Sequence, residues 1–142
     1  MEFFDILVRY EVALWNAVDR ELSRQGQISL AQQHALGVVD RHAGQARVQD
    51  LSDDIGITVG AASKLVDRLE RDGLALRSPN PANRRSSLIT LTAAGHKALM
   101  SASQVRAQVI ARAVGSEDIV TVTAALHRLQ TRLMSSQVGA PG

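Results

Sequence analysis

The sequence predicts a mainly α-helical fold with one short β-hairpin, and three observations support this prediction. Apolar residues recur at steps of three and four through most of the 142 residues, which is the period of an amphipathic helix. Between residues 74 and 91 this pattern gives way to two short apolar runs around a loop that contains two prolines. The aromatic residues number only 2 Phe, 1 Tyr and 1 Trp, so the core must consist mostly of aliphatic side chains, which suits packed helices.

Capping residues and glycines predict where the first three helices begin and end. The first helix covers residues 3–24, and its apolar face consists of Phe3, Leu7, Tyr10, Leu14, Val18 and Leu22. The residues from Ser29 to Gln32 have the pattern of a capping box and open a second helix that reaches about His42. A short third helix covers residues 48–55, with Gly56 as its left-handed C-terminal residue.

A fourth helix and a hairpin follow. Thr58 caps a helix that ends at Gly73, and we expect its buried face to carry Ala61, Ala62, Leu65, Val66 and Leu69. The hairpin strands are expected at residues 74–76 and 88–91. The two prolines between them should keep the long tip from pairing and make it project stiffly.

Two further helices complete the chain. One covers residues 92–114, and Gly115 separates it from a last helix that we expect to be capped by Ser116, with Glu117 and Asp118 in its first turn. Apolar residues of the last helix repeat at steps of three and four, which predicts a narrow seam that packs on another helix. The seam residues are Ile119, Val122, Leu126, Leu129 and Leu133.

Composition restricts the possible function. The absence of cysteine excludes disulfides, thiol nucleophiles and Cys-ligated zinc, and the lack of a long apolar run or a leader pattern predicts a cytoplasmic protein that does not associate with membranes. No catalytic triad, paired-carboxylate motif or phosphate loop stands out, so we expect no enzyme, no catalytic residue and no cofactor. Residues 64–116 hold 9 basic and 3 acidic side chains, which predicts an anionic partner for the middle of the chain.

A helix, a tight turn, a second helix and a basic hairpin occur in the order of a winged helix-turn-helix. The fourth helix is long enough to lie in the major groove of double-stranded DNA, and its N-terminus offers unpaired amides to a phosphate. The basic hairpin tip can reach a neighbouring minor groove. The candidate DNA-binding residues are Thr58, Val59, Gly60, Ala61, Ser63, Lys64, Arg68, Arg77, Asn83, Arg84 and Arg85. For Asp67, Arg68, Glu70 and Arg71 the mixed charges favour ion pairs that orient the helix.

Residues 50–100 contain four motifs in a fixed order, which are Asp-Leu-Ser-Asp-Asp-Ile-Gly-Ile-Thr, Ser-Lys-Leu-Val-Asp-Arg-Leu-Glu-Arg-Asp-Gly-Leu, Asn-Arg-Arg and Leu-Thr-Ala-Ala-Gly. Through these motifs the chain has a specific resemblance to the MarR family of bacterial transcription regulators. The resemblance implies one domain over 1–142, with a winged-helix lobe at 29–91 and dimerisation helices at 1–24 and 92–137. The implied protein is a homodimeric repressor of a pseudo-palindromic operator, in which Arg85 is the wing-tip arginine. The expected dimer contacts are Leu7, Leu14 and the seam of the last helix.

Two departures from the family pattern concern DNA recognition. Asn83 stands where the family usually has an aspartate, so an amide that can hydrogen-bond the backbone or an arginine replaces a charged group. The run Val59-Gly60-Ala61 has no hydrogen-bonding side chain, which favours contact with thymine methyl groups and readout of DNA shape. An alternative is a winged-helix module that binds DNA without sequence preference, or binds protein, and responds to no effector.

The histidines and the tryptophan have a possible role in effector binding. His34, His42, His96 and His127 lack a ligand spacing, so we expect no metal site. His34 and His42 are eight residues apart on one predicted helix and could line a pocket. The family resemblance implies a small aromatic or lipophilic effector near Trp15 and His34, whereas packing in the core is the favoured interpretation of Trp15 itself.

Overall fold

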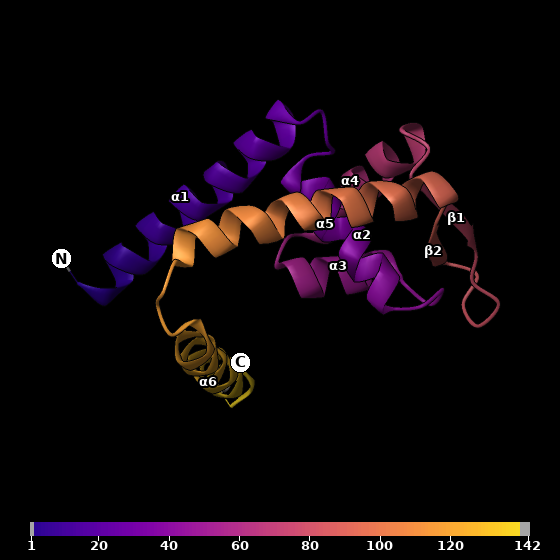
Figure 1. The fold of residues 1–142 in the computed structure, drawn as a ribbon. Helices are drawn as coiled ribbons and strands as arrows, with labels where there is room; N and C mark the ends of the chain where they lie inside the picture. Colours follow the sequence, from indigo (N-terminus) through magenta and orange to yellow (C-terminus); the bar gives the residue numbers. More distant parts are fainter. Residues whose placement is uncertain (1, 140–142) are drawn as a thin grey trace. The chain divides into compact units, whose positions relative to one another are not determined.

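The computed structural model describes residues 2–139, and its elements occur in the predicted order (Figure 1). Residue 1 and residues 140–142, the two ends of the predicted domain, lie outside the described residues. The elements are α1 (Phe3–Arg24), α2 (Leu30–Arg41), α3 (Val48–Ile55), α4 (Val59–Arg71), β1 (Ala75–Pro79), β2 (Ser87–Leu91), α5 (Ala93–Val114) and α6 (Ile119–Val138). The chain divides into two compact units, one ending at Ile110 and the other beginning at Ala111. The mainly helical fold class with one hairpin is confirmed.

Two hydrophobic clusters hold the first unit together. The larger cluster joins α2, α3, α4 and the hairpin, and Leu36, Leu51, Leu69 and Ile89 are fully buried within it. The smaller cluster joins α1 and α5 to the start of α2 and consists of Val18, Leu22, Leu30, Ala102 and Val105. Trp15 packs only partly buried against this second cluster.

The predicted caps of the three lobe helices are present. Ser29 and Gln32 form the capping box of α2, and Gly56 ends α3 with a φ of 78°. The Thr58 hydroxyl oxygen accepts a hydrogen bond from the Ala61 amide at 3.1 Å. This bond uses one of the amide groups that a helix N-terminus leaves unpaired.

The start of α6 and the hairpin differ from the prediction. Asp118, not Ser116, caps α6, because its carboxylate accepts hydrogen bonds from both the amide and the hydroxyl of Thr121. Strand β1 extends to Pro79, which pairs with Ser87, so only residues 80–86 form the tip. β1 is an edge strand of the two-stranded sheet, and proline is tolerated in an edge strand where no ladder hydrogen bond is required of its nitrogen.

A third backbone segment, not anticipated from the sequence, joins the hairpin. The Ile89 amide donates to the Ala46 carbonyl oxygen at 2.8 Å, and the two residues form an isolated antiparallel bridge. Ala46 precedes α3, so β2 is fixed between β1 and the entry to the helix-turn-helix.

Thr92 and Gly95 form the joint between α4, the hairpin and α5. The Thr92 hydroxyl donates to the Gly73 carbonyl oxygen at 2.6 Å and accepts from the Gly95 amide at 3.0 Å. A Cβ atom on Gly95 would lie 1.9 Å from the Leu74 carbonyl oxygen. This close approach gives a physical reason for glycine in the Leu-Thr-Ala-Ala-Gly motif.

Arg77 of β1 clamps the hairpin to α4. Its guanidinium donates to Asp67 at 2.7 Å, to Glu70, and to the Ser63 carbonyl oxygen at 3.3 Å. Burial acts to lower the pKa of Arg77, but the hydrogen bonds to the two carboxylates outweigh it, and the pKa lies above its ordinary value. The expected ion pairs are confirmed for Asp67 and Glu70, and Arg71 lies 3.7 Å from Asp72, but the expectation is wrong for Arg68, which makes no ion pair within residues 2–139.

We expect Gly95→Ala to lower the free energy of unfolding by about 1 to 3 kcal/mol, because the added methyl group must displace backbone. Gly37→Ala in α2 is the matched control, since its Cβ would meet only the flexible end of Arg41 at 3.5 Å. The control should raise the free energy of unfolding by about 0.5 to 1 kcal/mol through higher helix propensity. Urea denaturation measures both changes, and equal effects would contradict the proposed close packing at Gly95.

We expect Arg77→Ala to lower the free energy of unfolding by about 1 to 2 kcal/mol, since it leaves Glu70 without its partner; exposure of Asp67 moderates the effect. Arg71→Ala serves as control, because the Arg71 side chain is largely exposed and lies 3.7 Å from its neighbour Asp72. This control should change stability by less than about 0.5 kcal/mol. Thermal unfolding compares the two variants, and equal midpoints would argue against the clamp.

Candidate nucleic-acid interface

The start of α4 presents an apolar surface to solvent. Val59, Gly60 and Ala61 are all exposed, so the expectation that Ala61 belongs to the buried face is wrong. The buried face of α4 begins one residue later, at Ala62, and continues with Leu65, Val66 and Leu69. A 100° step per residue places Ala61 beside Ala62 but turned away from the core. A ligand that approaches this end of α4 meets methyl groups and backbone.

The polar candidate residues on α4 differ in whether their side chains make contacts within the protein. Lys64 and Arg68 are exposed, and neither side chain makes a hydrogen bond or ion pair to another residue between 2 and 139. Ser63 is partly buried, and its hydroxyl lies 3.4 Å from the Arg77 guanidinium. Arg77 itself is held by α4 and is therefore placed to orient that helix.

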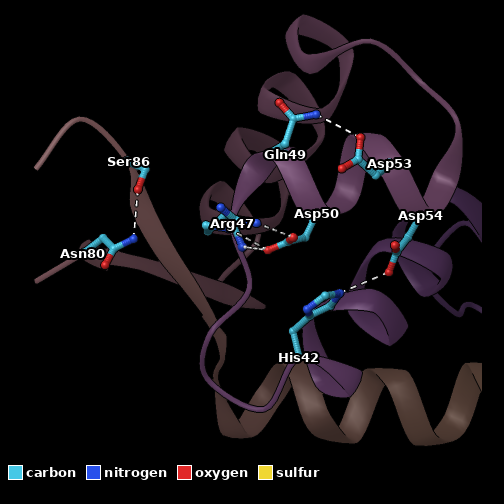
Figure 2. A network of polar contacts seen from close by, with 8 residues as sticks. All are labelled: His42, Arg47, Gln49, Asp50, Asp53, Asp54, Asn80 and Ser86. Atoms are coloured by element: carbon cyan, nitrogen blue, oxygen red, sulfur yellow. Dashed lines mark hydrogen bonds and ion pairs between the residues drawn. The ribbon is translucent and has the colours of Figure 1, made fainter. Parts of the chain in front are cut away.

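Amide side chains shape the tip of the hairpin. The Asn83 side-chain oxygen accepts from the Arg85 amide at 3.0 Å, and the Asn80 side-chain oxygen accepts from the Ala82 amide at 3.0 Å. Asn80 also donates to the Ser86 hydroxyl at 2.9 Å across the base of the tip (Figure 2). The expectation that the amide of Asn83 can bond the backbone is confirmed.

Arg84 and Arg85 are the exposed cations of the tip. Within residues 2–139 neither guanidinium makes a hydrogen bond or an ion pair, and both residues are exposed. Asn83 thus fixes the Arg85 backbone and leaves its guanidinium available to an anion. An aspartate at this position could have paired with that charge.

Acidic side chains characterise α3, the first helix of the helix-turn-helix (Figure 2). Arg47 donates to Asp50 from its backbone amide at 2.8 Å and from its guanidinium at 2.9 Å. The hydrogen bond from the Arg47 side chain is the main reason that the pKa of Asp50 lies below its usual range. Asp54 pairs with His42 at 3.1 Å. Arg47, which is not among the predicted site residues, is therefore neutralised locally, in contrast to Lys64 and Arg68 on α4 and to Arg84 and Arg85 at the tip.

A cavity of about 230 Å³ between α1, α2 and α5 brings Trp15 and His34 together. Their ring centroids are 6.2 Å apart with an interplanar angle of 42°. The remaining lining residues are Glu11, Leu14, Val18, Leu30, Arg106 and Ile110. A second hollow of about 360 Å³ shares Glu11, Trp15 and His34 with the first. His42 lines neither of these two cavities, so the expectation that it joins His34 there is wrong.

The charges at this cavity were not apparent from the sequence, because α1, α2 and α5 supply them from distant positions. Burial is the main cause that lowers the pKa of His34, and the positive charges of Arg106 and Arg41 lower it further. Glu11 contributes one negative charge to the lining. The imidazole of His34 therefore favours its neutral form, and the charges of the two guanidinium groups oppose its protonation.

The apolar residues that were expected at a dimer interface remain accessible in the single chain. Leu7 is exposed, whereas Leu14 is partly buried and lines the cavity. Helix α6 carries no buried residue, and all five seam residues are exposed: Ile119, Val122, Leu126, Leu129 and Leu133.

Two other kinds of site are absent from residues 2–139. No group of three His, Asp or Glu side chains in this range is arranged to hold a metal ion. In the same part of the chain no helix has both the length and the apolar character needed to cross a membrane.

Comparison with known proteins identifies the winged-helix segment. The model of the MarR family matches residues 28–87. The uncharacterized HTH-type transcriptional regulator YfiV of Bacillus subtilis (strain 168) is 32% identical over 65 residues. That alignment covers 46% of this chain and 40% of YfiV, so less than half of the relative's length is matched.

Solved structures share the fold over nearly the whole chain. A MarR-family transcriptional regulator from Rhodococcus sp. RHA1 has a TM-score of 0.79 at 22% identity, covering 92% of this chain and 94% of that one. The repressor CouR bound to a 23-mer DNA duplex has a TM-score of 0.80 at 22% identity, covering 93% and 92%. CouR from Rhodococcus jostii RHA1 bound to p-coumaroyl-CoA has a TM-score of 0.78 at 23% identity, covering 89% and 87%. The family model matches the winged-helix segment alone, and the solved structures, at 22 to 23% identity, show that the chain has their fold.

Proposed function

We propose that this chain is a transcriptional regulator that binds double-stranded DNA as a homodimer and represses the genes it controls. The observation that carries the proposal is the pairing of an exposed α4 N-terminus with a hairpin tip whose Arg84 and Arg85 are unengaged. CouR, which has the same fold, is a repressor bound to a DNA duplex, and this supports the assignment.

The two DNA-binding elements have different tasks in this proposal. Helix α4, with 13 residues, is about 20 Å long and fits the major groove. Val59 and Ala61 contact thymine methyl groups, while Lys64 and Arg68 contact phosphates along the helix. Arg84 and Arg85 bind the adjacent minor groove or its phosphates. Arg77 contributes indirectly, because it holds α4 at a set angle to the hairpin.

A second copy of the chain is the partner that the exposed apolar faces of α1 and α6 require. The dimerisation helices of the proposal comprise residues 1–24 and 92–137, flanking the DNA-binding lobe at 29–91. Two recognition helices related by a two-fold axis would read half-sites about 34 Å apart on one face of the DNA. The pseudo-palindromic operator follows from that symmetry.

The cavity beside Trp15 and His34 is the proposed effector site. Its apolar lining and the two guanidinium groups near His34 favour a small, largely apolar molecule with an anionic group. Binding of such a molecule would release the protein from its operator. CouR bound to p-coumaroyl-CoA supports the idea that this fold accepts an organic ligand.

The alternative is a winged-helix module without sequence preference, which the apolar start of α4 favours. Selection of bound duplexes from a random pool distinguishes the two possibilities. Enrichment of an inverted repeat supports the regulator, whereas undiminished binding to unrelated duplexes supports the alternative.

We expect Arg85→Ala to weaken DNA binding and to reduce the magnitude of the slope of log affinity against log salt by about 0.9 for each phosphate that the variant no longer binds. Arg20→Ala on α1 removes the same charge from an exposed position outside the lobe and serves as the control. Fluorescence anisotropy at several salt concentrations gives both quantities. An Arg85→Ala slope equal to that of Arg20→Ala would refute a role for the wing tip.

We expect Leu126→Asp to dissociate the homodimer and thereby abolish specific DNA binding, since it places a charge in the apolar seam. Ala124→Asp, two residues away and on the opposite side of α6, should remain dimeric. Light scattering reports the molar mass of each variant. A dimeric Leu126→Asp protein would overturn the proposed role of the seam.

A further inference from the structure

The first turn of α2, residues 29–33, is joined by side chains to three other helices. The Leu30 amide donates to Asp19 of α1 at 2.9 Å. Gln32 donates to the Asp72 carboxylate, at the C-cap of α4, at 2.9 Å. Gln33 donates to the Ser103 hydroxyl of α5 at 3.1 Å. One helical turn is thus tied to both the cavity-lining helices and the end of the recognition helix.

The side chains of Gln32 and Gln33 are polar but almost fully buried, since Gln32 is only 8% exposed and Gln33 only 4%. Burial of an amide group is unfavourable unless its hydrogen bonds are made. Within residues 2–139 every buried side-chain nitrogen and oxygen has a partner. Removal of one partner at these positions would therefore leave a buried polar atom unsatisfied.

Arg106 belongs both to this network and to the cavity. Its guanidinium lines the cavity and donates to the Gln33 side-chain oxygen at 3.0 Å. Arg106 is exposed, and a guanidinium has five N–H donors, so the group is able to turn toward a second acceptor. His34, the residue after Gln33, lines the same cavity.

We infer that the first turn of α2 is a relay between cavity and recognition helix, with Arg106 as its switch. An anionic group in the cavity draws the Arg106 guanidinium away from Gln33. The Gln33 oxygen then lacks a partner, the turn shifts to regain one, and the Gln32 contact to Asp72 at the end of α4 is loosened. This inference rests on the proposed function, of which it specifies the regulation.

The charges that face the cavity agree with an anionic ligand. Arg106 of α5 and Arg41 of α2 act on His34, while Glu11 of α1 supplies the opposing charge. Glu11 and Arg106 are both exposed, so water screens both charges. Arg41 does not line the cavity, but its positive charge adds to that of Arg106 at His34. The net charge near His34 therefore favours a carboxylate, and the aromatic pair of Trp15 and His34 contacts its apolar body.

The probe for the test is 2-naphthoate, and 2-naphthamide is its neutral control of nearly the same shape. Trp15 is the only tryptophan of the chain and lies in the cavity, so its fluorescence reports binding directly. Naphthoate should bind more tightly than naphthamide and should lower the affinity for the selected DNA about 5-fold or more, the usual size of allosteric coupling. Naphthamide should lower the affinity for the selected DNA by less than half of the factor measured with naphthoate.

Two substitutions of Gln33 should uncouple DNA binding from naphthoate in different ways. Gln33→Glu gives Arg106 a carboxylate partner, so we expect DNA affinity to be retained and naphthoate binding to weaken about tenfold or more. Gln33→Met removes the oxygen that would be left without a partner, so we expect DNA affinity to be retained and naphthoate to bind without lowering it. Gln108→Met, at an exposed position on α5, is the control and should behave as the wild type.

Hydrogen exchange of the amides at residues 65–73 separates this inference from the proposed function, because it requires no DNA. Naphthoate should accelerate exchange there in the wild type and in Gln108→Met, but not in Gln33→Met or Gln33→Glu. Exchange that responds in a protein without DNA affinity would support the relay and refute the regulator. DNA binding that responds to naphthoate equally in wild type, Gln33→Met and Gln33→Glu would overturn the relay. If Gln33→Met fails to unfold cooperatively, Gln33→Glu alone decides between these results.

Discussion

The close approach of Gly95 to the Leu74 carbonyl oxygen is the constraint on which the proposed DNA-binding surface depends. Because a Cβ atom at residue 95 would lie 1.9 Å from that oxygen, only glycine allows α5 to begin where the hairpin begins. Thr92 completes the joint by donating to Gly73 and accepting from Gly95. The end of α4, the first residues of the hairpin and the start of α5 are therefore held together here, and these contacts constrain the angle between α4 and the hairpin.

Arg77 extends that constraint along the hairpin. The sequence alone suggested that the positive charge of Arg77 contacts DNA. In the structure this charge pairs with Asp67 and Glu70. On α4 and the hairpin, Arg77 is neutralised internally, whereas Lys64, Arg68, Arg84 and Arg85 make no ion pair within the described residues. A winged helix of modest net charge can present a positive surface in this way, because the acidic residues of α3 and α4 are paired elsewhere.

The buried glutamines of α2 differ from the rest of the core in being polar. An aliphatic side chain at residue 32 or 33 would pack without the need for a partner, whereas each amide depends on a group from another helix. Such a contact is sensitive to the position of both helices. This dependence is what allows a small change at the cavity to reach α4, a distance in sequence of some forty residues.

The sequence alone determined those features that depend on interactions between neighbouring residues. The helices follow from apolar periodicity, and their starts follow from Ser29 and Thr58, because capping is a short-range interaction between neighbouring residues. The Asn83 contact with the backbone is equally local. Asp118 was missed because Ser116 is also a common N-cap residue, and Pro79 was missed because proline usually ends a strand and is tolerated only at an edge. Only the tertiary structure showed that Arg77 is paired, that Ala61 is exposed, and that Arg106 joins Trp15 and His34 at one cavity. These features depend on contacts between residues far apart in the chain, and the spacing of apolar residues along the sequence does not predict such contacts.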